Sequence, residues 1–143
     1  MSSATNIEAT LLLCDAAVGD PSGKMHMLGA GWSITGTPTA PAAVVVLLKV
    51  PWDRADRKLP IALRLVDADG HPVLIEGKAV GIRQALGMGR QPQVPSGVPI
   101  DASFAMNLGP MALPPGRYRW LLDIDDEQWS AGFTVMSRQR PAN

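Results

Sequence analysis

The sequence has little of the chemistry on which metal centres and disulfide scaffolds depend. Cys14 is the only cysteine among 143 residues, which excludes an intrachain disulfide and a cluster of thiolate ligands. His26 and His71 are the only histidines, and neither has a second histidine at the short spacing that places two zinc ligands together. We therefore expect no cofactor and no resident metal.

The chain also lacks an excess of either charge. Thirteen Lys and Arg residues balance thirteen Asp and Glu residues, giving a formal net charge of +0. Binding to nucleic-acid phosphates, or to an anionic membrane surface, needs an excess of basic side chains. No apolar run approaches the roughly 18–20 residues that span a bilayer, and the first residues lack the basic start of a signal peptide. We expect a cytoplasmic protein that binds neither nucleic acid nor membrane.

Catalytic and nucleotide-binding motifs are missing as well. Gly29 and Gly31 follow an apolar segment, but Ile34 stands where a dinucleotide-binding loop needs its third glycine. The prolines at 38 and 41 prevent the helix that should follow such a loop. There is no Gly-x-Ser-x-Gly motif, and Cys14 lies in an apolar run where burial makes a thiol unreactive. The absence of these motifs predicts a protein that is not an enzyme. We interpret the two glycines as a bulge or crossover at the end of a strand.

Alternating apolar and polar residues are the strongest pattern present. Residues 117–124 and 128–135 alternate on either side of the acidic turn 125–127, which predicts a β-hairpin with Trp120 and Trp129 on the core side. Residues 100–108 alternate in the same way and predict a further strand. The chain therefore favours strands over helices.

Two more hairpins are expected. Residues 61–66 lead through the turn Asp67–Gly70 to a returning strand that begins at residues 73–75. Near the N-terminus, the turn-forming residues 19–23 separate two apolar segments, so residues 8–29 are expected to form an opening hairpin.

Residues 43–50 are apolar at nearly every position. A strand with this composition is buried on both faces, either inside its own chain or under a partner subunit. Together the strands predict an all-β protein, an antiparallel immunoglobulin-like β-sandwich of about 7–8 strands. We expect one domain over residues 1–136 and a polar C-terminal tail over residues 137–143.

The two acidic turns raise the question of calcium. Asp67 and Asp69 resemble the start of an EF-hand loop, but Lys78 occupies the twelfth position, where that loop needs a glutamate. If strands alternate in direction, the turns at 67–70 and 125–127 lie at opposite ends of the sandwich. An extra strand within residues 78–98 would reverse this order. We interpret both as solvated turns.

The best candidates for contact with a ligand or partner are Trp32, Trp52 and Arg90. The two tryptophans flank predicted loops, and Arg90 is the only charge in the long segment 84–99, which is rich in Gly and Pro. Arg64, Arg117 and Arg119 fall on outward faces of predicted strands and are interpreted as solvated.

Three pairs of segments resemble a known family. They are LLLCDAA (11–17) with GKMHMLGAGW (23–32), VPWD (50–53) with LRLVDADG (63–70), and LPPGRYRW (113–120) with FTV (133–135). The chain resembles a family of short, uncharacterised bacterial proteins with members in actinobacteria. The resemblance implies a compact β-sandwich and carries over no activity and no site residues.

The function expected from the sequence is a non-enzymatic interaction module. It self-associates, giving a homo-oligomer, or docks on a protein partner, and the apolar residues 43–50 motivate this expectation. The alternative is a small-ligand or carbohydrate-binding module that uses Trp32, Trp52 and the 84–99 loop. A third possibility is a minor enzyme or metal protein whose site is shared by His26 and His71.

Overall fold

The computed structural model of the chain describes residues 6–87 and 93–137. Within these ranges it contains twelve strands and one short 3-10 turn, η1 (Trp52–Arg54). No helix in the described part is long and apolar enough to cross a bilayer. The prediction of an all-β protein is confirmed.

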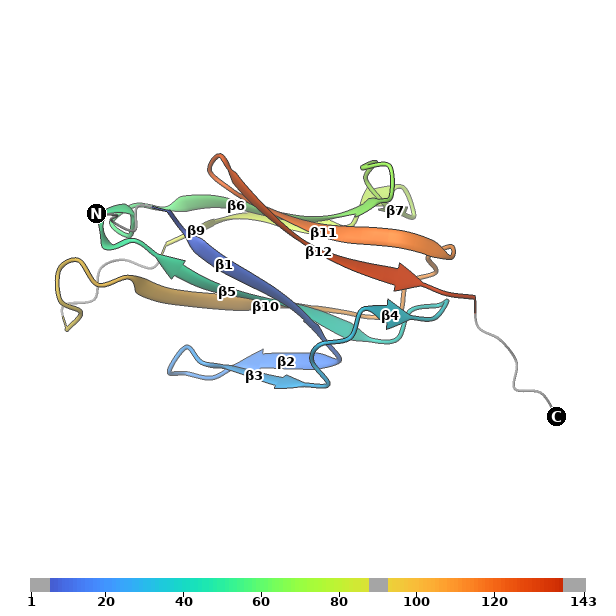
Figure 1. Cartoon of the computed structure of the whole chain (residues 1–143), viewed down its shortest axis with the longest axis horizontal. Coiled ribbons are helices and arrows are strands. Elements are labelled where there is room, and N and C mark those ends of the chain that lie inside the picture. Colours follow the sequence, from blue (N-terminus) through green and yellow to red (C-terminus); the bar gives the residue numbers. More distant parts are fainter. Residues whose placement is uncertain (1–5, 88–92, 138–143) are drawn as a thin grey trace.

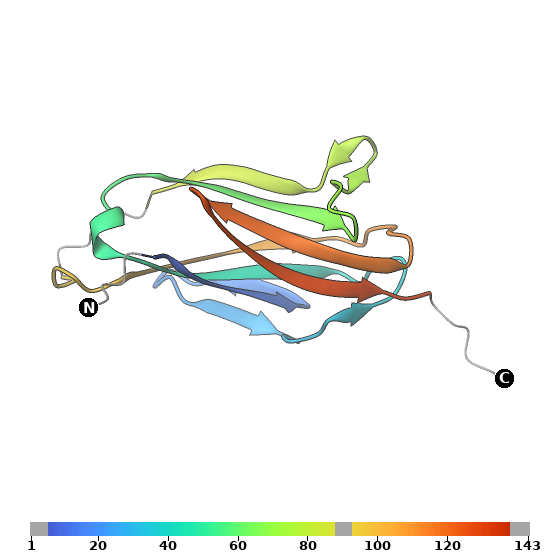
Figure 2. The same ribbon diagram turned by 45° about the horizontal axis from the view of Figure 1, so that its top comes forward.

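Two sheets pack face to face and form the sandwich (Figures 1 and 2). The three-stranded sheet has the order β1 (Glu8–Cys14), β5 (Ala42–Val50), β10 (Ile100–Leu108). The five-stranded sheet has the order β4 (Ile34–Thr35), β12 (Glu127–Val135), β11 (Gly116–Ile124), β6 (Leu59–Asp67), β9 (Gly81–Leu86). Neighbours are antiparallel except for β4, which runs parallel to β12. These eight strands agree with the expected number.

Four short strands form two small hairpins outside the sheets. β2 (Ala16–Gly19) pairs with β3 (Met25–Leu28), and β7 (Leu74–Ile75) pairs with β8 (Lys78–Ala79). The β2–β3 ribbon lies against the outer face of the three-stranded sheet, as a third layer below β5 and β10 in Figure 1.

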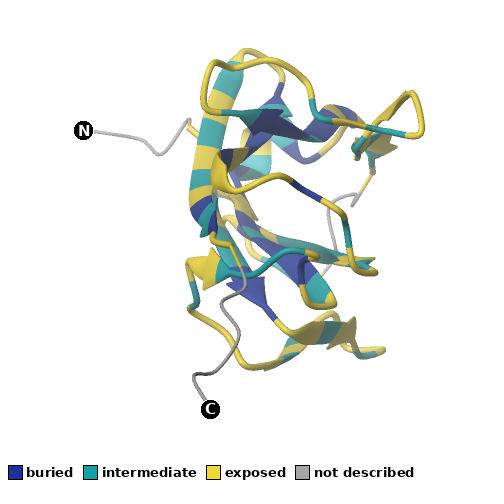
Figure 3. Cartoon of the chain, turned by 90° about the vertical axis from the view of Figure 1, so that its right-hand side faces the viewer, coloured by how far each residue is buried: buried dark blue, intermediate teal, exposed yellow. Residues whose placement is uncertain are grey.

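The main core lies between the two sheets. Alternate residues of β5, including Val44, Val46 and Leu48, meet Leu63, Leu65 and Leu122 from the opposite sheet. Seen from one end, the buried segments lie in the strands, and the connecting loops are mostly exposed (Figure 3). Strand β10 begins and ends where the alternation predicts, and its inward side chains pack against this core.

The hairpin of β11 and β12 confirms the strongest sequence prediction. The turn is one residue shorter than expected, because Glu127 already pairs with Ile124. Asp125 adopts a φ of 52° in this turn. Trp120 is buried and Trp129 packs against the core, as the alternation predicts. The hydroxyl of Tyr118 donates a hydrogen bond to the Pro114 carbonyl at 2.6 Å, which is the tyrosine corner found in immunoglobulin-like sandwiches.

The predicted hairpins at 8–29 and 61–75 are right in part: the first forms around its turn but from β2 and β3, and the second forms only next to its turn. β1 joins β5 instead of folding back on residues 25–28, because the chain turns at Asp15 and β2 takes that place. After the 67–70 turn the chain does return beside β6, where Pro72 bridges to Val66 and the Val73 amide donates to the Leu65 carbonyl at 3.0 Å. The pairing stops there, because residues 74–79 form the small β7–β8 excursion, and the neighbouring strand of β6 is β9. The segment 84–99 therefore begins inside a strand, and its residues 88–92 lie outside the described ranges, as do residues 138–143 of the predicted tail.

Candidate functional site

The two candidate tryptophans lie at opposite ends of the sandwich. Trp32 contacts Phe133 near the C-terminal end of β12, with ring centroids 6.2 Å apart in an edge-on arrangement. Trp52 begins the 3-10 turn in which Arg54 bridges to Glu127, at the N-terminal end of the same strand. A nine-residue strand is about 26 Å long at ~3.3 Å per residue, so the two rings do not form one platform. Arg90 lies outside the described residues.

Each tryptophan is half-buried and packs against the main core. The indole N–H of Trp32 is buried and has no acceptor among the residues that the structure describes. These positions resemble packing positions, in which an aromatic ring covers the edge of a core.

The Gly29–Gly31 segment is the crossover that leads from β3 towards β4. Both glycines adopt positive φ, 64° and 100°, which a residue with a side chain rarely does. The amide of Gly31 donates to the carbonyl of Leu13 at 2.8 Å. A Cβ at Gly29 would collide with the Asp15 carboxylate. The segment therefore serves a close approach of two segments of the chain, as the interpretation of a bulge or crossover predicts.

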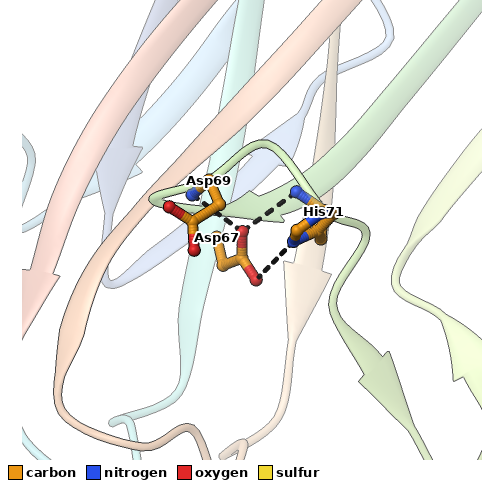
Figure 4. A group of neighbouring side chains, drawn as sticks. All are labelled: Asp67, Asp69 and His71. Carbon is orange, nitrogen blue, oxygen red and sulfur yellow. Dashed lines mark hydrogen bonds and ion pairs between the residues drawn. The ribbon is translucent and has the colours of Figure 1, made fainter.

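Asp67, Asp69 and His71 form the only group in the described ranges with the composition and spacing of a cation site (Figure 4). One carboxylate oxygen of Asp67 accepts the amide hydrogens of both Asp69 and His71 at 2.9 Å. The other lies 3.9 Å from Nδ1 of His71. Asp67 thus stabilises the turn through its own backbone contacts. Because β11 runs antiparallel to β6, the turn at Asp125 lies at the opposite end of the sheet.

The two histidines belong to different layers. His26 lies on the β2–β3 ribbon, where its Nε2 is 2.8 Å from Asp20. His71 lies on the turn after β6, in the other sheet. The structure therefore does not bring them together as ligands of one metal.

Cys14 lies under the ribbon and is completely buried. Its Sγ faces the carbonyl oxygens of Ala16 and Ala43 at 3.5 and 3.7 Å. Burial raises the pKa of the Cys14 thiol above its ordinary value, which disfavours the thiolate that acts as a nucleophile.

The ribbon has one buried face and one exposed face. Ala17, Met25 and Met27 pack on Ala43, Val45 and Cys14, and they form a second small core. The opposite side, which we call the ribbon face, consists of Ala16, Val18, His26 and Leu28. Val18 is 63% exposed and Leu28 is 71% exposed. Because Val18 pairs with His26 and Ala16 pairs with Leu28, the two large apolar side chains are diagonal neighbours.

The ribbon face was not predicted from the sequence, although the pattern of apolar residues in β2 and β3 indicates it. In two strands of four residues each, apolar residues occupy both alternating phases, so neither phase is purely polar. That pattern indicates a ribbon that still exposes apolar side chains on one side after its other side has packed on the sheet.

Strands β4, β11 and β12 form a second surface, on the outer side of the five-stranded sheet. A hollow there is lined by Ser33, Ile34, Arg117, Arg119, Gly132 and Thr134, among others. Its floor includes Gly132, which has no side chain, directly opposite Arg119 on the neighbouring strand. We call this surface the arginine hollow.

Comparison with known proteins gives a family and a distant structural likeness. No curated protein matches the chain. Among solved structures, the crystal structure of the PmoD soluble domain from Methylocystis sp. ATCC 49242 (Rockwell) is similar, with 16% identity and 95% coverage of each chain. Its TM-score of 0.39 is too low to carry an argument about this protein. The model of a family of unknown function, DUF6941, matches residues 9–135, nearly the whole chain and all six resemblance segments. This protein therefore belongs to the DUF6941 family, which confirms its resemblance to an uncharacterised family.

Proposed function

We propose that this protein is a non-enzymatic interaction module that self-associates through the ribbon face. The observation that carries the proposal is the exposure of Val18 and Leu28 on one side of a short ribbon whose other side is packed. Soluble proteins rarely leave neighbouring large apolar side chains in water unless a partner covers them. The proposal keeps the cytoplasmic location expected from the sequence.

The residues that first suggested self-association have a different role. Residues 43–50 are apolar on both faces because the main core takes one face and the ribbon takes much of the other. Val45 is fully buried within the chain itself. The ribbon face replaces β5 as the surface offered to a partner.

Electrostatics allows a second copy of the chain as the occupant. The only titratable group on the ribbon face is His26, and its imidazole hydrogen bonds to Asp20. Two ribbon faces brought together around a twofold axis would therefore place no unbalanced like charges in contact. The formal net charge of +0 adds no long-range repulsion between copies.

The expected affinity is low. Full burial of a Val or Leu side chain contributes about 1.5–3 kcal/mol. Two such side chains from each copy must offset an association cost of about 4–15 kcal/mol. We therefore expect a weak dimer that dissociates on dilution, with the ribbon face at its centre.

Sedimentation velocity over a wide concentration range tests this function. The wild-type chain should shift from monomer to dimer as its concentration rises, and the double variant Val18→Ser with Leu28→Ser should remain monomeric. Leu74→Ser is the matched control, because Leu74 is 60% exposed but lies on β7. This control should dimerise like the wild type.

Two results would contradict the proposal. A wild-type chain that stays monomeric at every concentration would rule out self-association. A dimer that persists in the double variant would place the interface away from the ribbon face.

A further inference from the structure

The arginine hollow combines two cationic groups with an apolar wall. Arg117 and Arg119 project from the outer side of β11, opposite Thr134 and Gly132 of β12. Ile34 of β4 pairs with Thr134 and is 62% exposed. The surface thus presents two guanidinium groups beside one large apolar side chain.

Neither guanidinium of the hollow has a carboxylate partner within the described ranges. Arg64, on the adjacent strand β6, behaves differently: its Nε donates to Asp123 at 3.2 Å. The acidic residue closest in the sheet pairing is Asp67, opposite Tyr118. Its carboxylate accepts the amides of its own turn. The positive charge of Arg117 and Arg119 is therefore available to a ligand.

The floor of the hollow is shaped by the absence of a side chain. A Cβ added at Gly132 would meet Tyr118 O at 3.7 Å and Arg119 Cγ at 3.8 Å, which is ordinary contact. Its φ is not in the left-handed region, so the backbone does not require glycine here. A glycine in the interior of a strand weakens the strand, and such positions often mark a site of close approach.

We infer that the arginine hollow is a docking site for an acidic peptide segment of a protein partner. Arg side chains form paired hydrogen bonds with carboxylates, which suits Asp or Glu side chains of the segment. An apolar residue next to the acidic one would lie over Gly132 against Ile34. The hydroxyl groups of Ser33 and Thr134, which also line the hollow, offer further donors.

The apolar component separates a peptide from a simple anion. Phosphate would use the guanidinium groups and leave Ile34 exposed, whereas an acidic segment with apolar residues covers both. The hollow and the ribbon face lie on opposite sides of the sandwich, because one belongs to the five-stranded sheet and the other overlies the three-stranded sheet. The inference therefore goes beyond the self-association proposed above, and each can fail without the other.

A nitrogen-15 NMR titration of the full chain tests the inference. The probe is the peptide acetyl-Glu-Leu-Glu-Leu-Glu-amide, and the reference probes are acetyl-Lys-Leu-Lys-Leu-Lys-amide and inorganic phosphate. We expect the acidic peptide to shift the amides of Ile34, Gly132 and Thr134 at concentrations where the other two probes do not.

Matched variants locate the site. Arg119→Gln should weaken binding of the acidic peptide about tenfold, which corresponds to a loss of about 1.4 kcal/mol in binding free energy. Arg83→Gln removes the same charge from the outer side of β9, outside the hollow, and should change the affinity by less than about twofold. Gly132→Leu should abolish binding by filling the hollow while the chain remains folded, because the backbone there accepts a side chain.

Three outcomes would overturn the inference. Equal shifts with phosphate would show an anion site without peptide recognition. Equal shifts with the lysine peptide would show an apolar patch without charge recognition. Equal losses in the Arg119→Gln and Arg83→Gln variants would show attraction to the whole face. The self-association experiment is unaffected by any of these results.

Discussion

The two outer faces of the sandwich differ in what covers them. The outer face of the three-stranded sheet carries Ala43, Val45 and Cys14 under the β2–β3 ribbon, and all three are fully buried. The outer face of β11 and β12 carries Arg117, Arg119, Gln128 and Ser130, all exposed to solvent. The same type of sheet thus tolerates apolar or polar outward residues according to whether a third layer is present.

This difference explains the patterns of the two central strands. β11 alternates over most of its length because its outer side faces water except at Leu121, which is buried, whereas β5 is apolar in both phases because it has a layer on each side. The ribbon is held in place by packing and by Asn107 of β10, whose amide donates to the Ala17 carbonyl at 3.0 Å. The Oδ1 atom of Asn107 also accepts a hydrogen bond from the Ala17 amide, at 3.4 Å.

The largest effect should come from placing a charge under the ribbon. Val45→Asp buries an unpaired carboxylate, and we expect the free energy of unfolding to fall by about 3–5 kcal/mol. Ser130→Asp introduces the same charge on the exposed outer face of β12 and should alter the free energy of unfolding by no more than about 0.5 kcal/mol. Chemical denaturation of both variants measures the contrast. Equal, small losses would mean that β5 is not covered in solution.

An intermediate effect should follow from releasing the ribbon. Asn107→Ala removes both side-chain contacts to Ala17 and should weaken ribbon docking by about 0.5–1.5 kcal/mol. Since Cys14 lies beneath the ribbon, its labelling by a thiol reagent should become roughly two- to tenfold faster, because 1.4 kcal/mol corresponds to a factor of ten. Ser103→Ala, on the same side of β10, is the control and should leave the rate unchanged. An unchanged rate in Asn107→Ala as well would show that the hydrogen bonds from Asn107 to Ala17 do not hold the ribbon in place.

The smallest effect should be a dependence of the ribbon turn on pH. The Ser22 hydroxyl and the His26 imidazole hydrogen bond to Asp20 and hold the pKa of its carboxyl well below the usual range. A carboxyl whose pKa is lower in the folded state stabilises that state fully above its unfolded pKa, about 3.9, and progressively less as the pH falls towards the folded value. Amide exchange in β2 and β3 should therefore show reduced protection below about pH 4. Asp20→Asn should show lower protection at neutral pH and no such change in acid; the same acid response in this variant would assign it to another group.

Much of the fold could be predicted from the sequence because its strongest patterns are local. The alternation in 117–124 and 128–135 places Trp120 in the core whatever the rest of the chain does, since a one-residue shift in register would expose the whole apolar set. The boundaries of β10 follow from alternation in the same way.

Pairings between distant segments could not be predicted in this way. Residues 8–14 are apolar enough to pair with several strands, and nothing local favours β5 over β3. The same uncertainty affected β6, whose partner β9 follows a small hairpin that interrupts the expected return. For the candidate sites, sequence position identified Trp32 and Trp52 as loop residues but gave no indication that they lie at opposite ends of β12.

By itself, the sequence determined the class of fold, the inward faces of β10, β11 and β12, and the lack of a disulfide or an excess of charge. These properties depend on composition and on the period of two along each strand. Only the tertiary structure decided that the ribbon covers β5, which leaves Val18 and Leu28 exposed and Cys14 buried. It also set Gly132 between Arg119 and the Ile34–Thr134 pair, because strand order and register fix which residues become neighbours across a sheet.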